Sequence, residues 1–147
     1  EALAGYAPPL HRCELVGTLD GVEYINDSKA TNLHALESAL ISQDRPTVLI
    51  AGGKEKGLDY EPLLPLLADH VASVVVFGEI GEALRSLFSE VVATSAASSL
   101  EEAVELARAA ARPGGTVLFS PGTSSFDMFS GYEERGDAFR AAFQALK

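Results

Sequence analysis

Residues 47–51 of the chain are TVLIA, and Gly52-Gly53 follow directly. A short run of β-branched and aliphatic residues is typical of a strand buried on both faces, and the glycines predict that it ends in a loop. Residues 73–77 (SVVVF) and 116–119 (TVLF) repeat this pattern, and residues 91–94 (VVAT) predict a shorter strand. These runs indicate strands in the interior of a sheet.

Helical patterns separate these strands. Ser98 or Ser99 can cap the fourth predicted helix, which extends to Ala111 before Pro113-Gly114-Gly115 ends it. The predicted helices cover residues 32–41, 61–69, 81–88, 98–111 and 133–146. Alternation of strands and helices from Val22 onward predicts an α/β fold, with a Rossmann-like, doubly wound and mostly parallel sheet.

The first part of the chain predicts an edge hairpin. Asp20-Gly21 separates two β-prone runs, residues 14–19 and 22–26, and Asp-Gly is a strong hairpin signal. The hairpin would add one antiparallel strand at the edge of the sheet. Residues 1–10, with Pro8-Pro9, are interpreted as an interdomain linker, and residues 11–147 as one domain that follows upstream domains of a longer chain.

The composition is that of a soluble globular domain. The chain has 147 residues, of which 47% are hydrophobic and 22% charged, and its net charge is -10. That charge argues against nucleic acid and anionic membranes as partners. No signal peptide or membrane-spanning run is present, and the single Cys13 fits a cytoplasmic location. Next to a predicted strand, Cys13 is interpreted as a packed thiol rather than a nucleophile.

The lysines are concentrated in loops. Of the four lysines, Lys29, Lys54 and Lys56 fall in two short loops, and the fourth is Lys147. This arrangement indicates either a local anion site or ordinary solvated lysines, and composition leaves both open. The three histidines have no spacing with cysteine or carboxylates that indicates a metal site.

Three loops are expected to follow the carboxyl ends of strands, where open α/β sheets bind ligands. We call them the first loop (residues 26–32, NDSKATN), the second loop (52–57, GGKEKG) and the third loop (120–127, SPGTSSFD). If the predicted strands are correct, all three loops lie along one rim of the sheet. Their convergence predicts a binding site.

Each loop also has a simpler interpretation. The first loop offers outward N–H groups for an anion, or is a plain helix start capped by Ser28 or Thr31. The second brings glycines and lysines to a ligand, or is a flexible surface turn; Leu58-Asp59 follows where a P-loop needs Lys-Ser/Thr, so no P-loop is present. The third presents hydroxyl and N–H groups to a carboxylate, or is a tight turn.

Taken together, the motifs resemble the C-terminal domain of the Mur ligases, and in particular the members that add D-glutamate. The stretches that carry the resemblance are residues 11–14 (HRCE), 21–32 (GVEYINDSKATN) and 120–139 (SPGTSSFDMFSGYEERGDAF). The resemblance implies an ATP-dependent ligase of peptidoglycan synthesis. In such an enzyme ATP phosphorylates the carboxylate of UDP-N-acetylmuramoyl-L-alanine, and the amine of D-glutamate attacks the acyl phosphate. The P-loop and the Mg²⁺ ligands would then lie in the upstream domains.

The same resemblance implies roles for individual residues. Arg12 and Asp27 match ATP contacts, and Lys29 matches a catalytic lysine near the phosphates and the intermediate. The positions that match contacts to D-glutamate are Thr31, Lys56, Ser125, Phe126 and Tyr132. Tyr132 stands where the familiar form has phenylalanine, and Lys54-Glu55 replaces Asp-Gly, so either Lys54 or Lys56 could face the pocket.

Two other functions remain as alternatives. One is a stand-alone nucleotide- or amino-acid-binding module without a catalytic parent. The other is a related ligase such as a folylpolyglutamate synthase, which should lack the stretch 125–132. Because the chain has no P-loop, it is expected to be inactive in isolation as a ligase.

Overall fold

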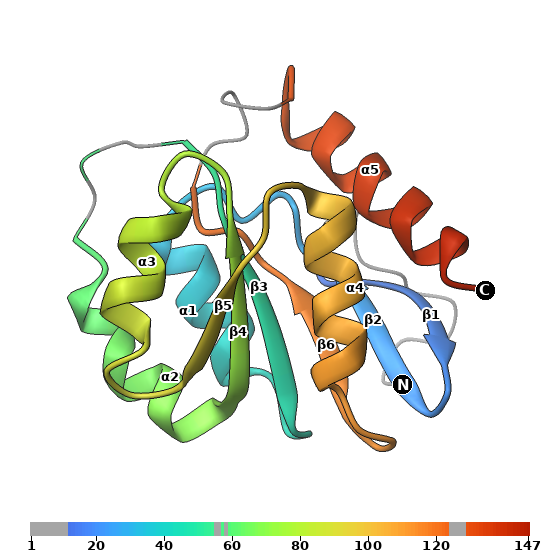
Figure 1. The fold of residues 1–147 in the computed structure, drawn as a ribbon, viewed down its shortest axis with the longest axis horizontal. Helices are drawn as coiled ribbons and strands as arrows, with labels where there is room; N and C mark the ends of the chain where they lie inside the picture. Colours follow the sequence, from blue (N-terminus) through green and yellow to red (C-terminus); the bar gives the residue numbers. More distant parts are fainter. Residues whose placement is uncertain (1–11, 55–56, 58, 124–128) are drawn as a thin grey trace.

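The computed structural model describes residues 12–54, 57, 59–123 and 129–147. Its centre is a six-stranded sheet with the order β1-β2-β6-β3-β4-β5, in which only the β1–β2 pair is antiparallel (Figure 1). The strands are β1 (Glu14–Leu19), β2 (Val22–Asn26), β3 (Thr47–Gly52), β4 (Val71–Phe77), β5 (Ala93–Ala96) and β6 (Thr116–Phe119). The predicted α/β fold with an antiparallel edge strand is confirmed.

Helices cover both faces of the sheet (Figure 1). Alternate residues of β3 show the two layers, since Val48 and Ile50 belong to one buried cluster and Leu49 and Ala51 to the other. The first cluster includes α4 (Leu100–Ala110) and α5 (Tyr132–Ala145), and the second includes α1 (Leu33–Ile41), the 3-10 turn η1 (Glu61–Leu63), α2 (Leu64–His70) and α3 (Gly81–Phe88). The sheet is therefore doubly wound.

The edge hairpin turns at Asp20 and Gly21, which have φ angles of 55° and 80°. Two successive positive φ angles give the tight turn that matches the twist of the flanking strands, and glycine adopts this conformation without strain. At Gly17, where the register shifts, a Cβ would lie 2.7 Å from the Phe143 ring. The hairpin and α5 are thus packed closely together.

Several predicted elements differ from the structure by one or two residues at their ends, and two of these differences have a local cause. The strand expected at residues 91–94 is Ala93–Ala96, because the N–H groups of Val91 and Val92 donate to Phe88 O and close the end of α3. The helix expected from residue 61 begins as the 3-10 turn η1, and α2 starts afterwards at Leu64. Pro65 has no N–H to continue an α-helical ladder back to Glu61, which accounts for the tighter first turn.

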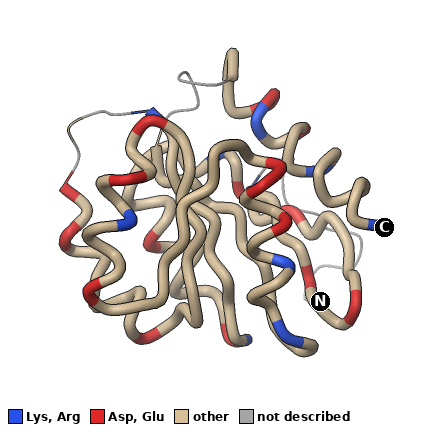
Figure 2. The backbone as a smooth tube through the Cα atoms, viewed as in Figure 1, with Lys and Arg blue, Asp and Glu red and all other residues tan. Residues whose placement is uncertain are grey.

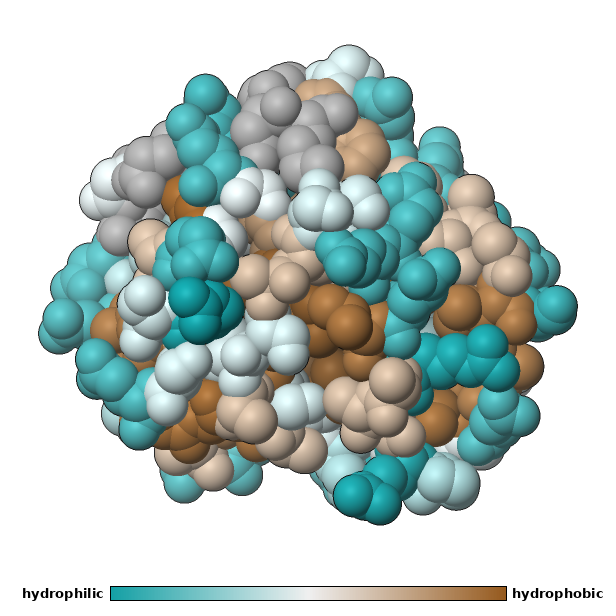
Figure 3. Space-filling model, in the orientation of Figure 1, coloured by the Kyte–Doolittle hydropathy of each residue, from teal (hydrophilic) through white to brown (hydrophobic). Residues whose placement is uncertain are grey.

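The chain carries 21 acidic and 11 basic residues, and the face seen in Figure 3 is mixed in hydropathy. Acidic positions outnumber basic ones over the helices and turns in Figure 2, and in Figure 3 the apolar areas are bordered by hydrophilic side chains. Among the described residues, the exposed large hydrophobic side chains are Leu15, Ile41 and Val91. In the described part of the chain, no helix combines the length and apolar character that crossing a membrane requires.

Candidate functional site

The three loops contact one another at the carboxyl ends of the parallel strands, along the upper edge in Figure 1. The N–H of Gly122 in the third loop donates to Ala30 O in the first loop at 2.9 Å. The hydroxyl of Thr123 donates to Lys54 O in the second loop at 2.8 Å. The predicted convergence on one rim is confirmed for the described residues of these loops.

Asp27 is a buried carboxylate at the centre of this junction, and its side chain contacts two other segments. Its Oδ1 accepts the N–H of Cys13 at 3.0 Å, and its Oδ2 accepts the hydroxyl of Ser120 at 2.7 Å. Burial raises the pKa of Asp27, although the hydrogen bonds from Ser120 and Cys13 partly oppose this. The chain therefore places a desolvated acid between the start of β1 and the third loop.

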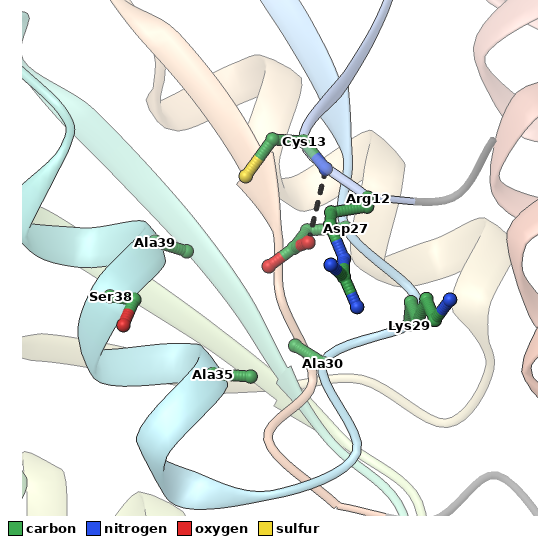
Figure 4. A pocket seen from close by; sticks show the side chains of 8 residues that line it. All are labelled: Arg12, Cys13, Asp27, Lys29, Ala30, Ala35, Ser38 and Ala39. Carbon is green, nitrogen blue, oxygen red and sulfur yellow. Dashed lines mark hydrogen bonds between the residues drawn. The ribbon is translucent and has the colours of Figure 1, made fainter. Parts of the chain in front are cut away.

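Asp27 lines a pocket of about 290 Å³ (Figure 4). One side of the pocket is polar, and Ala35, Ser38 and Ala39 of α1 line the other side. The full lining is Arg12, Cys13, Asp27, Lys29, Ala30, Ala35, Ser38 and Ala39. The structure thus brings together the three residues predicted to contact ATP, namely Arg12, Asp27 and Lys29.

Cys13 also lines the pocket, but its environment is that of a packed thiol. Its side chain is half-buried and contacts the apolar cluster under α1. Burial, followed by the nearby charge of Asp27, raises the pKa of the thiol to about 11. Since the thiolate is the nucleophilic form, Cys13 is protonated and unreactive near neutral pH.

Three backbone N–H groups of the first loop donate to acceptors inside the protein. The N–H of Asp27 donates to Phe119 O at 2.7 Å, and the N–H of Ser28 donates to Asn26 Oδ1 at 3.1 Å. The N–H of Ala30 donates to Asp27 O at 2.9 Å. These three groups are directed inward, so the expectation of outward N–H groups is wrong for them.

The observed N-cap of α1 lies one residue after Thr31 and four after Ser28, the two predicted caps. Asn32 is the N-cap, and its Oδ1 accepts the N–H of Ala35 at 2.8 Å. The interpretation in which Ser28 or Thr31 caps this helix is therefore wrong. Ser28 is instead free to bond to the last helix of the chain.

The start of α5 packs against the first loop. The hydroxyl of Ser28 donates to Tyr132 O at 2.8 Å, and Lys29 Nζ lies 5.9 Å from the centre of the Tyr132 ring. Glu134 accepts both the N–H and the hydroxyl of Ser130, at 2.6 and 2.9 Å, which stabilises the helix start. Lys29, a predicted ATP contact, and Tyr132, a predicted D-glutamate contact, are thus neighbours.

The family model described as "Mur ligase, glutamate ligase domain" matches residues 11–123. The chain belongs to this Mur ligase family. It is 51% identical to a UDP-N-acetylmuramoylalanine–D-glutamate ligase from Salinibacter ruber, over 99% of this chain and 32% of that protein. The protein of the same name from Geobacter metallireducens is also 51% identical, over 99% of this chain and 32% of that protein. The chain therefore spans about a third of the length of these curated relatives.

Solved structures share the fold at low sequence identity. A Mycobacterium tuberculosis folylpolyglutamate synthase complexed with ADP has a TM-score of 0.66 and 16% identity, and the match covers 92% of this chain and 32% of that one. The Thermotoga maritima UDP-N-acetylmuramate-alanine ligase has a TM-score of 0.62 and 15% identity, with 93% and 30% covered. Both similarities show that the fold is shared.

Much of the D-glutamate set predicted for this Mur ligase domain lies outside the described residues. Lys56, Ser125 and Phe126 belong to that part, and so does the linker at residues 1–10. Thr31 is half-buried in the first loop, and Lys54 is exposed in the second. These assignments stay predictions. Across the described residues, no group of three or more His, Cys, Asp or Glu side chains could hold a metal ion.

One buried residue of the site was not predicted from this Mur ligase sequence. Arg135 in α5 has an exposed fraction of 0%. Its Nε donates to Ser28 Oγ at 3.0 Å, its Nη2 to Ser28 O at 2.8 Å and its Nη1 to Thr123 O at 3.0 Å. Arg135 therefore bonds to both the first and the third loop.

The helical periodicity of α5 contained a signal for Arg135. The residue lies on the same stripe as Phe139, Ala142 and Phe143, all of which are buried. When positions i+4, i+7 and i+8 of a helix are apolar and buried, an arginine at position i faces the interior with them. A charge buried there requires hydrogen-bond partners. Its partners are 107 and 12 residues away, so their identity could not be read from local sequence.

Proposed function

We propose that this chain is the C-terminal domain of an ATP-dependent ligase that joins D-glutamate to UDP-N-acetylmuramoyl-L-alanine in cytoplasmic peptidoglycan synthesis. The observation that carries the proposal is 51% identity, across 99% of the chain, to a ligase of that name. The pocket lined by Arg12, Asp27 and Lys29 supports it, because these residues suit a ligand with hydroxyl groups and negative charge. The chain would supply the amino acid contacts and part of the ATP site.

On the ATP side, Asp27 accepts hydrogen bonds from the N–H of Cys13 on Oδ1 and from the hydroxyl of Ser120 on Oδ2. Each oxygen keeps further accepting capacity, which a sugar hydroxyl could use. Arg12 is exposed at the mouth of the pocket, and Lys29 contributes a second cation. The two cations suit a polyphosphate, while the Mg²⁺ that accompanies ATP would be held by the upstream domains.

On the amino acid side, D-glutamate presents two carboxylates, which require cations and hydroxyl or N–H donors. The proposed contacts are Thr31, Lys56, Ser125, Phe126 and Tyr132. Each charge-assisted hydrogen bond contributes roughly 1.5–3 kcal/mol. Binding would hold the amine of D-glutamate against the acyl phosphate made from UDP-N-acetylmuramoyl-L-alanine, so the contribution of this domain is one of proximity and orientation.

The proposal is tested by steady-state kinetics of the full-length parent enzyme with two lysine variants. Lys56→Ala should raise the KM for D-glutamate by roughly tenfold or more, the effect of losing one charge-assisted bond, and should leave the KM for ATP nearly unchanged. Lys54→Ala is the matched control in the same loop. Unchanged D-glutamate kinetics in Lys56→Ala would remove the assignment of Lys56, and a D-glutamate effect in Lys54→Ala instead would transfer it to Lys54.

The stand-alone binding module makes a different prediction about the parent reading frame. A ligase requires an upstream segment of the type Gly-x-x-Gly-Lys-Thr/Ser, which cradles the phosphates of ATP. A binding module does not require that segment. A parent chain without it, or one that shows no D-glutamate-dependent phosphate release, would overturn the proposed function.

A further inference from the structure

Arg135 does not line the pocket, but its side chain donates hydrogen bonds to two of the loops at the rim. Its guanidinium is fully buried, and it donates from three nitrogen atoms to two loops that are distant in the sequence. Burying a guanidinium is costly unless its donors are satisfied, so such a residue holds its partners in a defined geometry. Of the proposed substrate contacts, Asp27, Lys29 and Thr31 belong to the first loop, and Ser125 and Phe126 to the third.

We propose that Arg135 is a positioning residue that sets the first loop against the third loop and so couples the two halves of the substrate site. This inference rests on the proposed function, because it identifies the halves as the ATP side and the D-glutamate side. Through Ser28, Arg135 fixes the backbone next to Asp27 and Lys29. Through Thr123 O, it fixes the chain immediately before residues 124–128.

Ser28 is the relay in this arrangement. Its hydroxyl accepts from Arg135 Nε and donates to Tyr132 O, its carbonyl accepts from Arg135 Nη2, and its N–H donates to Asn26 Oδ1. Ser28 is buried, with an exposed fraction of 0%. A displacement of Arg135 must therefore shift Ser28, and the adjoining Lys29 shifts with it.

Thr123 connects Arg135 to the second loop as well. The carbonyl of Thr123 accepts from Arg135, and its hydroxyl donates to Lys54 O at 2.8 Å. One guanidinium thus reaches the first loop directly, the third loop directly and the second loop through one residue. Lysine cannot replace it, since a single ammonium cannot reproduce the planar set of N–H donors of arginine.

The principal test is Arg135→Lys in the full-length parent ligase, assayed by steady-state kinetics with ATP and D-glutamate varied separately. The variant keeps the positive charge but has one ammonium group in place of the three donating nitrogens of the guanidinium. At least one charge-assisted hydrogen bond to a loop is therefore lost. We expect the KM for both substrates to rise by about tenfold or more, which corresponds to one such bond. A residue with only a structural role would lower the Tm and leave both KM values unchanged.

Two control variants separate positioning from stability. Phe88→Leu creates a small cavity in the cluster under α3, on the other face of the sheet, and should lower the Tm without changing either KM. Arg108→Lys alters an exposed arginine that bonds to Asp20 and Leu146 O, and it should change neither quantity. If Arg135→Lys behaves like Phe88→Leu, with a lower Tm and wild-type KM values, the inference is wrong.

Ser28→Ala provides a second, smaller perturbation that tests the relay. It removes one hydroxyl, should also raise both KM values, and should not add its full effect to that of Arg135→Lys in the double variant. Fully additive effects would overturn the relay, and wild-type kinetics of Ser28→Ala would do so even if Arg135→Lys does not fold. The proposed function fails separately, if the wild-type parent enzyme shows no D-glutamate ligation.

Discussion

At the scale of single residues, Asp27 is a buried carboxylate whose burial disfavours the charged form. Burial raises its pKa above the ordinary value of 3.8, and the hydrogen bonds of Ser120 and Cys13 offset this only in part. A raised pKa in the folded state means that the charged form is relatively unfavourable there. Asp27 therefore reduces stability near neutral pH, a cost that is typical of functional positions.

Asp27→Asn tests this cost through its pH dependence. The stabilising contribution of the protonated acid is present below the ordinary pKa and is lost as pH rises through the raised folded pKa. Asparagine does not titrate and can still bond to Cys13 N–H and to Ser120. The unfolding free energy of the wild type, relative to Asp27→Asn, should thus increase as pH falls through this window.

Urea unfolding of both proteins across acidic to neutral pH measures that difference directly. Glu82→Gln is a control, because Glu82 is an exposed acid whose pKa is lowered by Arg85 rather than raised. A pH-independent difference between the wild type and Asp27→Asn would contradict a raised pKa for Asp27.

At the scale of elements, the start of α4 shows how a local motif defines a helix. Ser99 Oγ accepts the N–H of Glu102 at 3.1 Å, and Glu102 Oε1 accepts the N–H of Ser98 at 2.6 Å. Two N–H groups at the helix start are thereby satisfied reciprocally. Because α4 covers one face of the sheet with Leu100 and Val104, its start contributes to the stability of the whole core.

Ser99→Ala should therefore lower the unfolding free energy by about 1 kcal/mol, the usual cost of losing an N-cap. Thermal or urea unfolding measures this loss. Ser89→Ala, beyond the end of α3, is a matched control, since the Ser89 contact at that helix end is made by its backbone N–H. Equal effects of the two substitutions would argue against a specific cap at Ser99.

The contact between the second and third loops can be tested in the same way. Thr123→Val keeps the shape of a fully buried side chain but removes the hydroxyl that donates to Lys54 O. The expected loss in unfolding free energy is about 1 kcal/mol, the net contribution of one hydrogen bond. Thr94→Val removes a local bond to Val92 O and serves as the comparison. A neutral Thr123→Val would show that this bond does not hold the loops together.

Local patterns were sufficient for most elements and insufficient for their contacts. The hairpin at Asp20-Gly21, the buried strands and Ser99 as one of two candidate caps could be predicted, because each depends on neighbours in the sequence. The displaced strand β5 depended on how α3 ends, and the role of Arg135 depended on partners in distant loops. The sequence therefore predicted which loops form the site, but not the hydrogen bonds that connect them.

At the scale of the whole molecule, strand order explains why the loops meet. The sequence order of the strands gives no indication that β6 lies between β2 and β3, yet the sheet order β2-β6-β3 makes them neighbours. The first, third and second loops leave the carboxyl ends of these strands in that spatial order. The crossover from β5 through α4 to β6 thus assembles a single rim from three distant segments, as is usual for ligand sites in open α/β sheets.

The last prediction concerns the chain in isolation. It contains no P-loop and spans about a third of the length of its curated relatives, so the proposed ATP contacts of this chain form only part of an ATP site. Phosphoryl transfer requires phosphates and metal held on both sides of the reacting groups. We therefore expect no D-glutamate-dependent phosphate release from the purified 147-residue chain with ATP, Mg²⁺ and UDP-N-acetylmuramoyl-L-alanine, while the full-length parent enzyme is active under the same conditions. Turnover by the isolated chain would mean that its own residues complete the ATP site.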